Sequence, residues 1–231
     1  MNKIMDPEWD DAALRAGHRQ RLEDKFLDNK LSPAEVVELW LCDVIPRRDV
    51  RPLARRLMAK FGGVHQILAA SFESLKQMPG VGAKTARRIK TVHALHLLDD
   101  QEQLTRQPIF HDITVLTNYC RNMLMGKEIE EFHVLYLDGD YKLLADVTHS
   151  VGTVDFAQVY PREIVQRALN LHARSIVLVH NHPTAGMPFS TPDIELTTSI
   201  RDILSPMGVE LFDHYLVAGM TVYSARNLNF I

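Results

Sequence analysis

The spacing of apolar positions changes character a little past residue 100. Before that point, apolar residues recur every three or four positions, as Val50, Leu53 and Leu57 do, which is typical of helices with one buried face. After it, short β-branched runs such as "RSIVLVH" alternate with helical segments, which indicates strands and helices in one unit. The chain therefore predicts two domains, an all-helical one followed by an α/β one.

Helical patterns in the first domain carry recognisable end signals. Ser32 and Glu35 form the Ser-x-x-Glu pattern of a capping box, and Gly62-Gly63 end another helical segment. The charged stretch "DDQEQLTRQP" ends at Pro108 and predicts a linker. We therefore expect a helical domain over residues 1–100, a linker over 101–108 and a second domain over 109–231. The helices expected in the first domain cover 32–45, 49–63, 64–70, 71–78 and 82–98.

The second domain shows strand patterns bounded by turn residues. Two strands over 130–138 and 141–150 are joined at Asp138-Gly139-Asp140, a sequence typical of hairpin turns. The run over 174–180 is short and β-branched, which predicts a buried strand. The other elements expected here are helices over 112–124, 161–173 and 191–208, and strands over 209–219 and 221–225.

Composition excludes several classes of protein. No apolar run reaches the roughly 18 residues that a membrane span needs. The first residues lack a basic segment followed by an apolar one, so no secretion signal is expected. Cys42 and Cys120 lie far apart in the chain and predict two reduced thiols rather than a disulfide framework. We expect a cytoplasmic protein without a membrane partner.

Charge is unevenly distributed along the chain. Residues 1–107 hold 18 Lys and Arg against 15 Asp and Glu, a net charge of +3, whereas residues 108–231 hold 8 against 14, a net charge of −6. The basic residues cluster in "PRRDVRPLARRLMAK" and "KQMPGVGAKTARRIK". Opposite signs suggest that the two domains have different partners. Solvated helix faces also explain such clusters, and nucleic-acid binding requires more than charge.

Residues 75–90 contain a Pro-Gly-Val-Gly turn between two expected helices. Glycines in the turn permit backbone angles that other residues avoid, and the amides of residues 81–83 are expected to be free to hold an anion. The segment resembles the helix-hairpin-helix motif of DNA-binding proteins, which holds a backbone phosphate without reading bases. A packing device without a ligand is the alternative. The DNA-binding residues that the resemblance implies are Gly80, Val81, Gly82, Lys84, Arg87 and Arg88.

The stretch "HNHPTAGMPFSTPD", residues 180–193, gathers potential metal ligands. In a strand, His180 and His182 lie on one face, roughly 6.6 Å apart along it, so both imidazoles can reach one cation. Asp193 supplies a third ligand from the first turn of the next helix, and water takes the fourth position, as in catalytic zinc sites. The alternative is a polar loop that leads to a helix capped by Ser190.

The spacing H-x-H-x(7)-S-x(2)-D matches the JAMM (MPN-type) metalloprotease motif. Beyond the motif, "EEFHVLYLDGD", "GTVDFAQVYPREIVQRAL", "VLVHNHPTAGMPFSTPD" and "LFDHYLVAG" occur in the order seen in bacterial RadC-family proteins, and the similarity covers nearly all of the chain after about residue 17. The resemblance implies a small all-α helix-hairpin-helix domain followed by a three-layer α/β JAMM domain. That domain is cytidine-deaminase-like, with a mixed, mostly antiparallel sheet.

The resemblance also implies a role for each site residue. His180, His182 and Asp193 match the ligands of one Zn²⁺ per chain, which lowers the pKa of a water molecule. Glu130 matches the family's general base, with Glu131 as the competing assignment. Ser190 matches the residue that donates a hydrogen bond to the oxyanion. His214 has no partner at a ligand spacing, and we expect it to be satisfied within its strand rather than to support the metal site.

Three functions are consistent with these features. The favoured one is a RadC-like zinc metallopeptidase or isopeptidase that cleaves a protein or peptide substrate, with a DNA-binding N-terminal domain and a link to DNA repair or recombination. A metal-dependent nuclease is the second. The third is a non-catalytic DNA-binding adaptor. The presence of a base together with an open metal position argues against it, because a site without catalytic activity needs neither.

Overall fold

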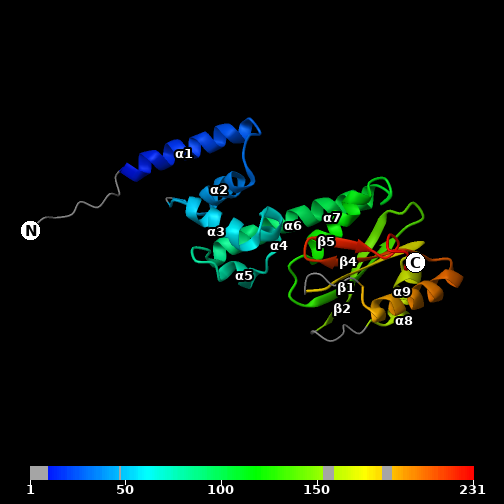
Figure 1. The fold of residues 1–231 in the computed structure, drawn as a ribbon. Helices are drawn as coiled ribbons and strands as arrows, with labels where there is room; N and C mark the ends of the chain where they lie inside the picture. The colour runs from blue at the N-terminus through cyan, green and yellow to red at the C-terminus, as the bar shows by residue number, and fades with distance from the viewer. Residues whose placement is uncertain (1–9, 47, 153–158, 184–188) are drawn as a thin grey trace, which may run out of the picture. The chain divides into compact units, whose positions relative to one another are not determined.

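A computed structural model of the chain describes residues 10–46, 48–152, 159–183 and 189–231. The chain divides into two compact units, one that ends at Val92 and one that runs from His93 to Ile231. The first is helical, and the second contains the sheet (Figure 1). The mixed α/β class predicted from the apolar pattern is confirmed.

Helices of the first unit share one apolar core. Leu41, Leu57 and Leu75 from three helices, and Ala86 and Ile89 from a fourth, are fully buried in it. The predicted ends are confirmed as well, since Ser32 caps its helix in a capping box and Gly62 ends another with φ +91°. The helices are α1 (Asp10–Leu27), α2 (Pro33–Val44), α3 (Arg51–Phe61), α4 (Val64–Ala69), α5 (Phe72–Lys76) and α6 (Ala83–Arg106).

Residues 101–106 of the expected linker are helical, because α6 continues to Arg106. Leu104 explains the helix here: its side chain is only 2% exposed and belongs, with Leu116, to an apolar cluster of the second unit. One well-placed apolar residue therefore anchors a stretch whose other side chains are mostly charged or polar. These residues are therefore helical, and the linker and the domain limits stay a prediction.

Within the described residues, five strands form one sheet in the order β2-β1-β3-β4-β5. Only β3 and β4 are parallel, and the crossover between them contains the helix α9; all other neighbours are antiparallel. The mixed, mostly antiparallel sheet is thus confirmed. The strands are β1 (Glu130–Leu137), β2 (Leu143–Gly152), β3 (Ser175–Asn181), β4 (Glu210–Ala218) and β5 (Thr221–Ser224).

Helices cover both faces of this sheet, which makes three layers (Figure 1). Leu135 and Val179 point to the layer that contains α7, whereas Val134 and Leu178 point to the opposite layer, with α8 and α9. Because strand side chains alternate, neighbouring residues serve opposite cores. The helices are α7 (Ile113–Leu124), α8 (Pro161–Asn170) and α9 (Thr191–Leu204), which the short 3-10 turn η1 (Ser205–Met207) follows. No helix in the described part of the chain has the length and apolar character to cross a membrane.

Candidate metal centre

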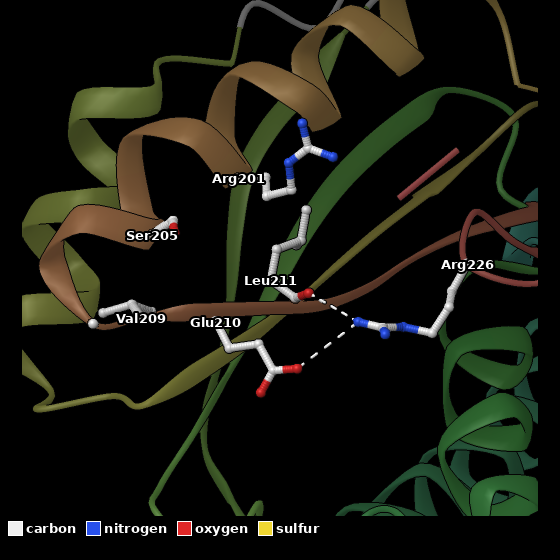
Figure 2. Close-up of a pocket in the computed structure, with 7 residues that line it drawn as sticks. Arg201, Ser205, Val209, Glu210, Leu211 and Arg226 are labelled. Atoms are coloured by element: carbon white, nitrogen blue, oxygen red, sulfur yellow. Dashed lines mark hydrogen bonds and ion pairs between the residues drawn. The ribbon is translucent and has the colours of Figure 1, made fainter. Parts of the chain in front are cut away.

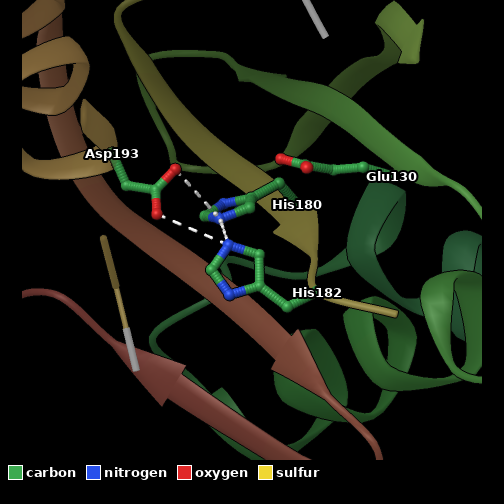
Figure 3. A group of neighbouring side chains, drawn as sticks. All are labelled: Glu130, His180, His182 and Asp193. Atoms are coloured by element: carbon green, nitrogen blue, oxygen red, sulfur yellow. Dashed lines mark hydrogen bonds and ion pairs between the residues drawn. The ribbon is translucent and has the colours of Figure 1, made fainter. Parts of the chain in front are cut away.

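Three neighbouring elements bring four predicted site residues together (Figure 3). His180 lies in β3, and His182 follows one residue past its end, where its amide still donates to the carbonyl of Val217 at 3.0 Å. Asp193 lies in the first turn of α9. Glu130 is the first residue of β1. Glu130, 50 positions or more from the other three residues, thus meets them where two inner strands of the sheet, β1 and β3, begin and end.

The donor atoms of this cluster lie close together. His180 Nε2 is 3.3 Å from His182 Nε2 and 3.4 Å from Asp193 Oδ1. His182 Nε2 is 3.5 Å from Asp193 Oδ2. With Glu130 included, one potential ligand atom of each residue lies within 4.8 Å of all the others. Two imidazoles and one carboxylate therefore face a common point.

These separations fit a tetrahedral metal ion. Zinc bonds to nitrogen and oxygen of about 2.0–2.1 Å place neighbouring donors about 3.3–3.4 Å apart in a tetrahedron. The distances from His180 Nε2 to His182 Nε2 and to Asp193 Oδ1 agree with that spacing, whereas the 3.5 Å distance from His182 Nε2 goes to the other Asp193 oxygen, Oδ2. The donor set of two imidazoles and a carboxylate is also one that divalent transition metals accept. The residues present thus fit a metal ion held by three protein ligands.

The alternation of β1 separates the two candidate bases. Phe132 and Val134 face the layer of α8 and α9, as the metal-ligand candidates do, and Glu130 shares their side of the strand. Glu131 lies on the other side, where Lys127 pairs with it at 2.8 Å and His133 lies 3.3 Å away. Partial burial is the largest single effect on Glu131 and raises its pKa, but Lys127 and His133 together outweigh burial and lower that pKa. Glu130 is therefore the glutamate in position to act at the cluster.

Ser190 is the N-cap of α9 and forms a complete capping box with Asp193. Its hydroxyl donates to Asp193 Oδ2 at 2.6 Å, and it accepts from the Asp193 amide at 3.3 Å. The helix cap at Ser190, which the sequence offers as an alternative to a metal site, is thus present together with the cluster of potential ligands. In this arrangement the single proton of Ser190 is directed to Asp193.

Electrostatics keep Asp193 ionised. Burial alone raises the pKa of its carboxyl group, but the neighbouring imidazoles of His180 and His182 and the hydroxyl of Ser190 outweigh burial and hold that pKa well below its usual range. A carboxylate with this low pKa needs positive partners in a site that is only partly exposed. The cluster therefore offers a permanent negative charge to a cation.

Two further residues join the site that sequence reasoning does not place there. The Nε2 atom of His214, in β4, lies 2.7 Å from the Nδ1 atom of His180. Thr197, one turn after Asp193 in α9, lies 2.6 Å from His214 Nδ1 and donates to the backbone carbonyl of Asp193. The expectation that His214 is only satisfied within its strand is wrong. The pairing of β3 with β4 carries this contact, and spacing within the sequence contains no sign of it.

Aromatic rings close the buried side of the cluster. Phe132 stacks on His180 with ring centres 6.0 Å apart, and Phe189 packs against His214 with centres 5.0 Å apart. His180 and His214 are fully buried, and that burial lowers the pKa of His214 well below its usual value. The imidazole pair therefore sits in an environment that disfavours charge.

A separate pocket of about 360 Å³ lies at the other end of α9 (Figure 2). Arg226 is one of the residues that line the pocket. Its guanidinium group donates to the carbonyl of Leu211 at 3.3 Å and pairs with Glu210 at 3.8 Å. Since Asp193 is in the first turn of α9 and this pocket lies near its last turn, the two do not coincide. No candidate metal ligand lines the pocket.

The hairpin turn of the helical unit differs from the expectation in two details. Gly80 has φ +95°, as expected, but Gly82 is not among the glycines with positive φ. The amide of Val81 is not free, because it donates to the carbonyl of Met78 at 2.9 Å, and the Val81 side chain is buried. Val81 is therefore a packing residue of the turn. Gly82 faces open space, since a Cβ atom there would meet nothing within 4 Å.

Known proteins match both the site-bearing domain and the whole chain. The model of the RadC-like JAB domain matches residues 110–230. The UPF0758 protein SPO0054 of Ruegeria pomeroyi is 36% identical over 212 residues, which cover 90% of this chain and 95% of the relative. The UPF0758 protein FN0909 of Fusobacterium nucleatum is 34% identical over 218 residues, with 90% and 94% covered. With the metal-ligand candidates inside the matched region, the chain belongs to the RadC family, whose JAB domain it carries.

Proposed function

We propose that this protein is a zinc-dependent hydrolase of amide bonds, a metallopeptidase or isopeptidase. The observation that carries the proposal is the cluster of Glu130, His180, His182 and Asp193, whose potential ligand atoms lie within 4.8 Å of one another. Two imidazoles and one carboxylate from His180, His182 and Asp193 would hold one zinc ion per chain and leave a fourth position open. An open position together with a nearby carboxylate is typical of catalytic rather than structural zinc.

The protein groups divide the work of hydrolysis. A zinc ion bound at the cluster would supply a Lewis acid that polarises the scissile carbonyl and lowers the pKa of water. Glu130 would accept the proton of the attacking water and return it to the leaving amine. Ser190 would donate to the oxygen of the tetrahedral intermediate once its hydroxyl turns from Asp193 to the substrate. Phe132 and Phe189 keep water from the inner side of the ligands.

Charge favours a peptide over nucleic acid as the substrate at the cluster. Residues 108–231 carry a net charge of −6, which repels a phosphate backbone. The helical domain, with residues 1–107 at +3, is the better place for DNA. This division supports a hydrolase that is brought to DNA, with a role in repair or recombination, over a nuclease. A cytoplasmic location stays a prediction.

DNA binding is proposed for the hairpin turn and the first turns of α6. Lys84, Arg87 and Arg88 lie there, next to the open surface at Gly82. Arg56 adds a further positive group, since it donates to the carbonyl of Pro79 in the turn at 3.2 Å. A left-handed glycine, an unobstructed approach and several basic side chains together suit one backbone phosphate.

The hydrolase is tested with Glu130→Gln in the full chain. The variant should retain one zinc ion, because a neutral amide keeps the shape of the side chain, but should lose hydrolysis by about 10²- to 10⁴-fold. Turnover is measured on a panel of peptides, isopeptide-linked peptides and DNA. Glu131→Gln is the matched control and should retain activity. Cleavage of DNA alone would replace the peptidase with a nuclease, and full activity of Glu130→Gln would reject Glu130 as the base.

The hairpin is tested by replacing Lys84, Arg87 and Arg88 with Ala. Affinity for duplex DNA should fall for all sequences alike, and each lost phosphate contact should reduce the slope of log affinity against log salt by about 0.9. Lys30→Ala, an exposed basic residue that pairs with Asp28, is the control and should leave the slope unchanged. An unaltered slope in the triple variant would leave the turn with a packing role only.

A further inference from the structure

We infer that Thr197 and His214 are positioning residues that fix the tautomer of His180, so that its Nε2 lone pair points at the metal position. This inference rests on the metal-binding part of the proposed function. Its basis is a continuous chain of hydrogen bonds from the backbone of Asp193, through Thr197 and His214, to His180. The chain joins α9, β4 and β3, and two of its members belong to the candidate ligand set.

Proton counting determines the direction of every bond in this chain. The carbonyl oxygen of Asp193 can only accept, so the single hydroxyl proton of Thr197 goes to it. The lone pair of Thr197 Oγ1 must then accept from His214, which places a proton on His214 Nδ1. Thr197 therefore selects one of the two neutral forms of His214.

The second half of the chain passes this selection to His180. His214 is fully buried, and Phe132 and Phe189 pack against its ring, so burial disfavours a positive charge on it. Its Nε2 atom thus carries a lone pair and accepts from His180 Nδ1 at 2.7 Å. A neutral His180 with a proton on Nδ1 has none on Nε2.

The consequence appears at the cluster itself. Without a proton, His180 Nε2 cannot donate to Asp193 Oδ1, although the two atoms lie only 3.4 Å apart. The hydrogen-bond chain that orients His180 therefore leaves its Nε2 lone pair available to a metal ion held beside Asp193. A ligating histidine whose other nitrogen donates to a fixed acceptor is a general feature of metal sites.

The test uses full-length wild type, Thr197→Val and Thr197→Ser. Valine keeps the shape of threonine but cannot accept from His214, whereas serine retains the hydroxyl. Zinc affinity, measured by competition with a chromophoric chelator, should fall about 10- to 100-fold in Thr197→Val and stay within about twofold of wild type in Thr197→Ser. Circular dichroism of both variants verifies that the fold is retained.

A second measurement needs no metal. Long-range ¹H–¹⁵N spectra of the metal-free wild type should show His180 with its proton on Nδ1, and Thr197→Val should show a mixture of tautomers. A proton on Nε2 in the wild type, or equal zinc affinity of a folded Thr197→Val, would overturn the inference while leaving the zinc hydrolase in place. A wild-type protein that takes up no zinc would overturn both.

Discussion

The helices α2 and α9 begin with the same local device but meet different surroundings. Ser32 and Glu35 form a capping box at the start of α2, and Ser190 and Asp193 form one at the start of α9. In each, one carboxylate oxygen accepts from the amide and the hydroxyl of the N-cap serine. Locally, the two helix starts are equivalent.

The difference lies in what else each carboxylate meets. The second oxygen of Glu35 accepts from Lys25 at 2.7 Å, a surface ion pair whose lysine is half exposed. The oxygens of Asp193 face His180 at 3.4 Å and His182 at 3.5 Å, beside the buried strand β3. A capping box therefore defines where a helix starts. The residues that surround its carboxylate in space decide whether that carboxylate can also bind a ligand.

Removal of the acid should produce the largest contrast. Asp193→Ala should reduce the zinc content from one ion per chain to none, because it removes one of three protein ligands and the permanent negative charge. His182→Ala should do the same. Glu35→Ala removes a capping acid of the same kind and should leave the zinc content unchanged. Metal analysis by mass spectrometry decides the matter, and zinc retained in Asp193→Ala would remove this residue from the ligand set.

Removal of the cap serine should have a moderate effect. Ser32→Ala and Ser190→Ala should each cost about 0.5–2 kcal/mol of unfolding free energy, since each leaves backbone amides of a first turn unsatisfied. Ser190→Ala should in addition slow hydrolysis, by about 10²- to 10³-fold if its hydroxyl donates to the oxyanion. Thermal unfolding and turnover are measured on both variants. Equal turnover of Ser190→Ala and wild type would limit Ser190 to capping.

The smallest effect concerns the pH dependence of the structural cap. Lys25 first, and then Ser32, lower the pKa of Glu35 to about 2. Since the unfolded value is about 4.3, the ionised carboxylate stabilises the fold above that pH, and this contribution is lost as pH falls through about 2. The difference in melting temperature between wild type and Glu35→Gln should therefore shrink between pH 5 and pH 2. A constant difference over that range would show that the carboxylate's charge is not what stabilises α2.

Much of the fold follows from local pattern. The capping boxes at Ser32 and Ser190, the left-handed end at Gly62 and the hairpin at Asp138-Gly139 all depend on residues within a few positions of one another, so the sequence predicts them. The helical conformation of residues 101–106 does not follow from local pattern, because a single buried leucine, Leu104, among charged residues gives little periodic signal. Packing, which involves distant residues, keeps that segment helical.

By itself, the sequence determined the elements of this protein, the spacing of His180, His182 and Asp193, and the family to which the chain belongs. Tertiary structure placed Glu130, and not Glu131, in the cluster with the candidate metal ligands, because the pairing of β1 with its neighbours sets which side chain faces the α9 layer. It also decided that His214 lies against His180. Side chains from separate strands meet only through sheet register, which no spacing along one strand contains.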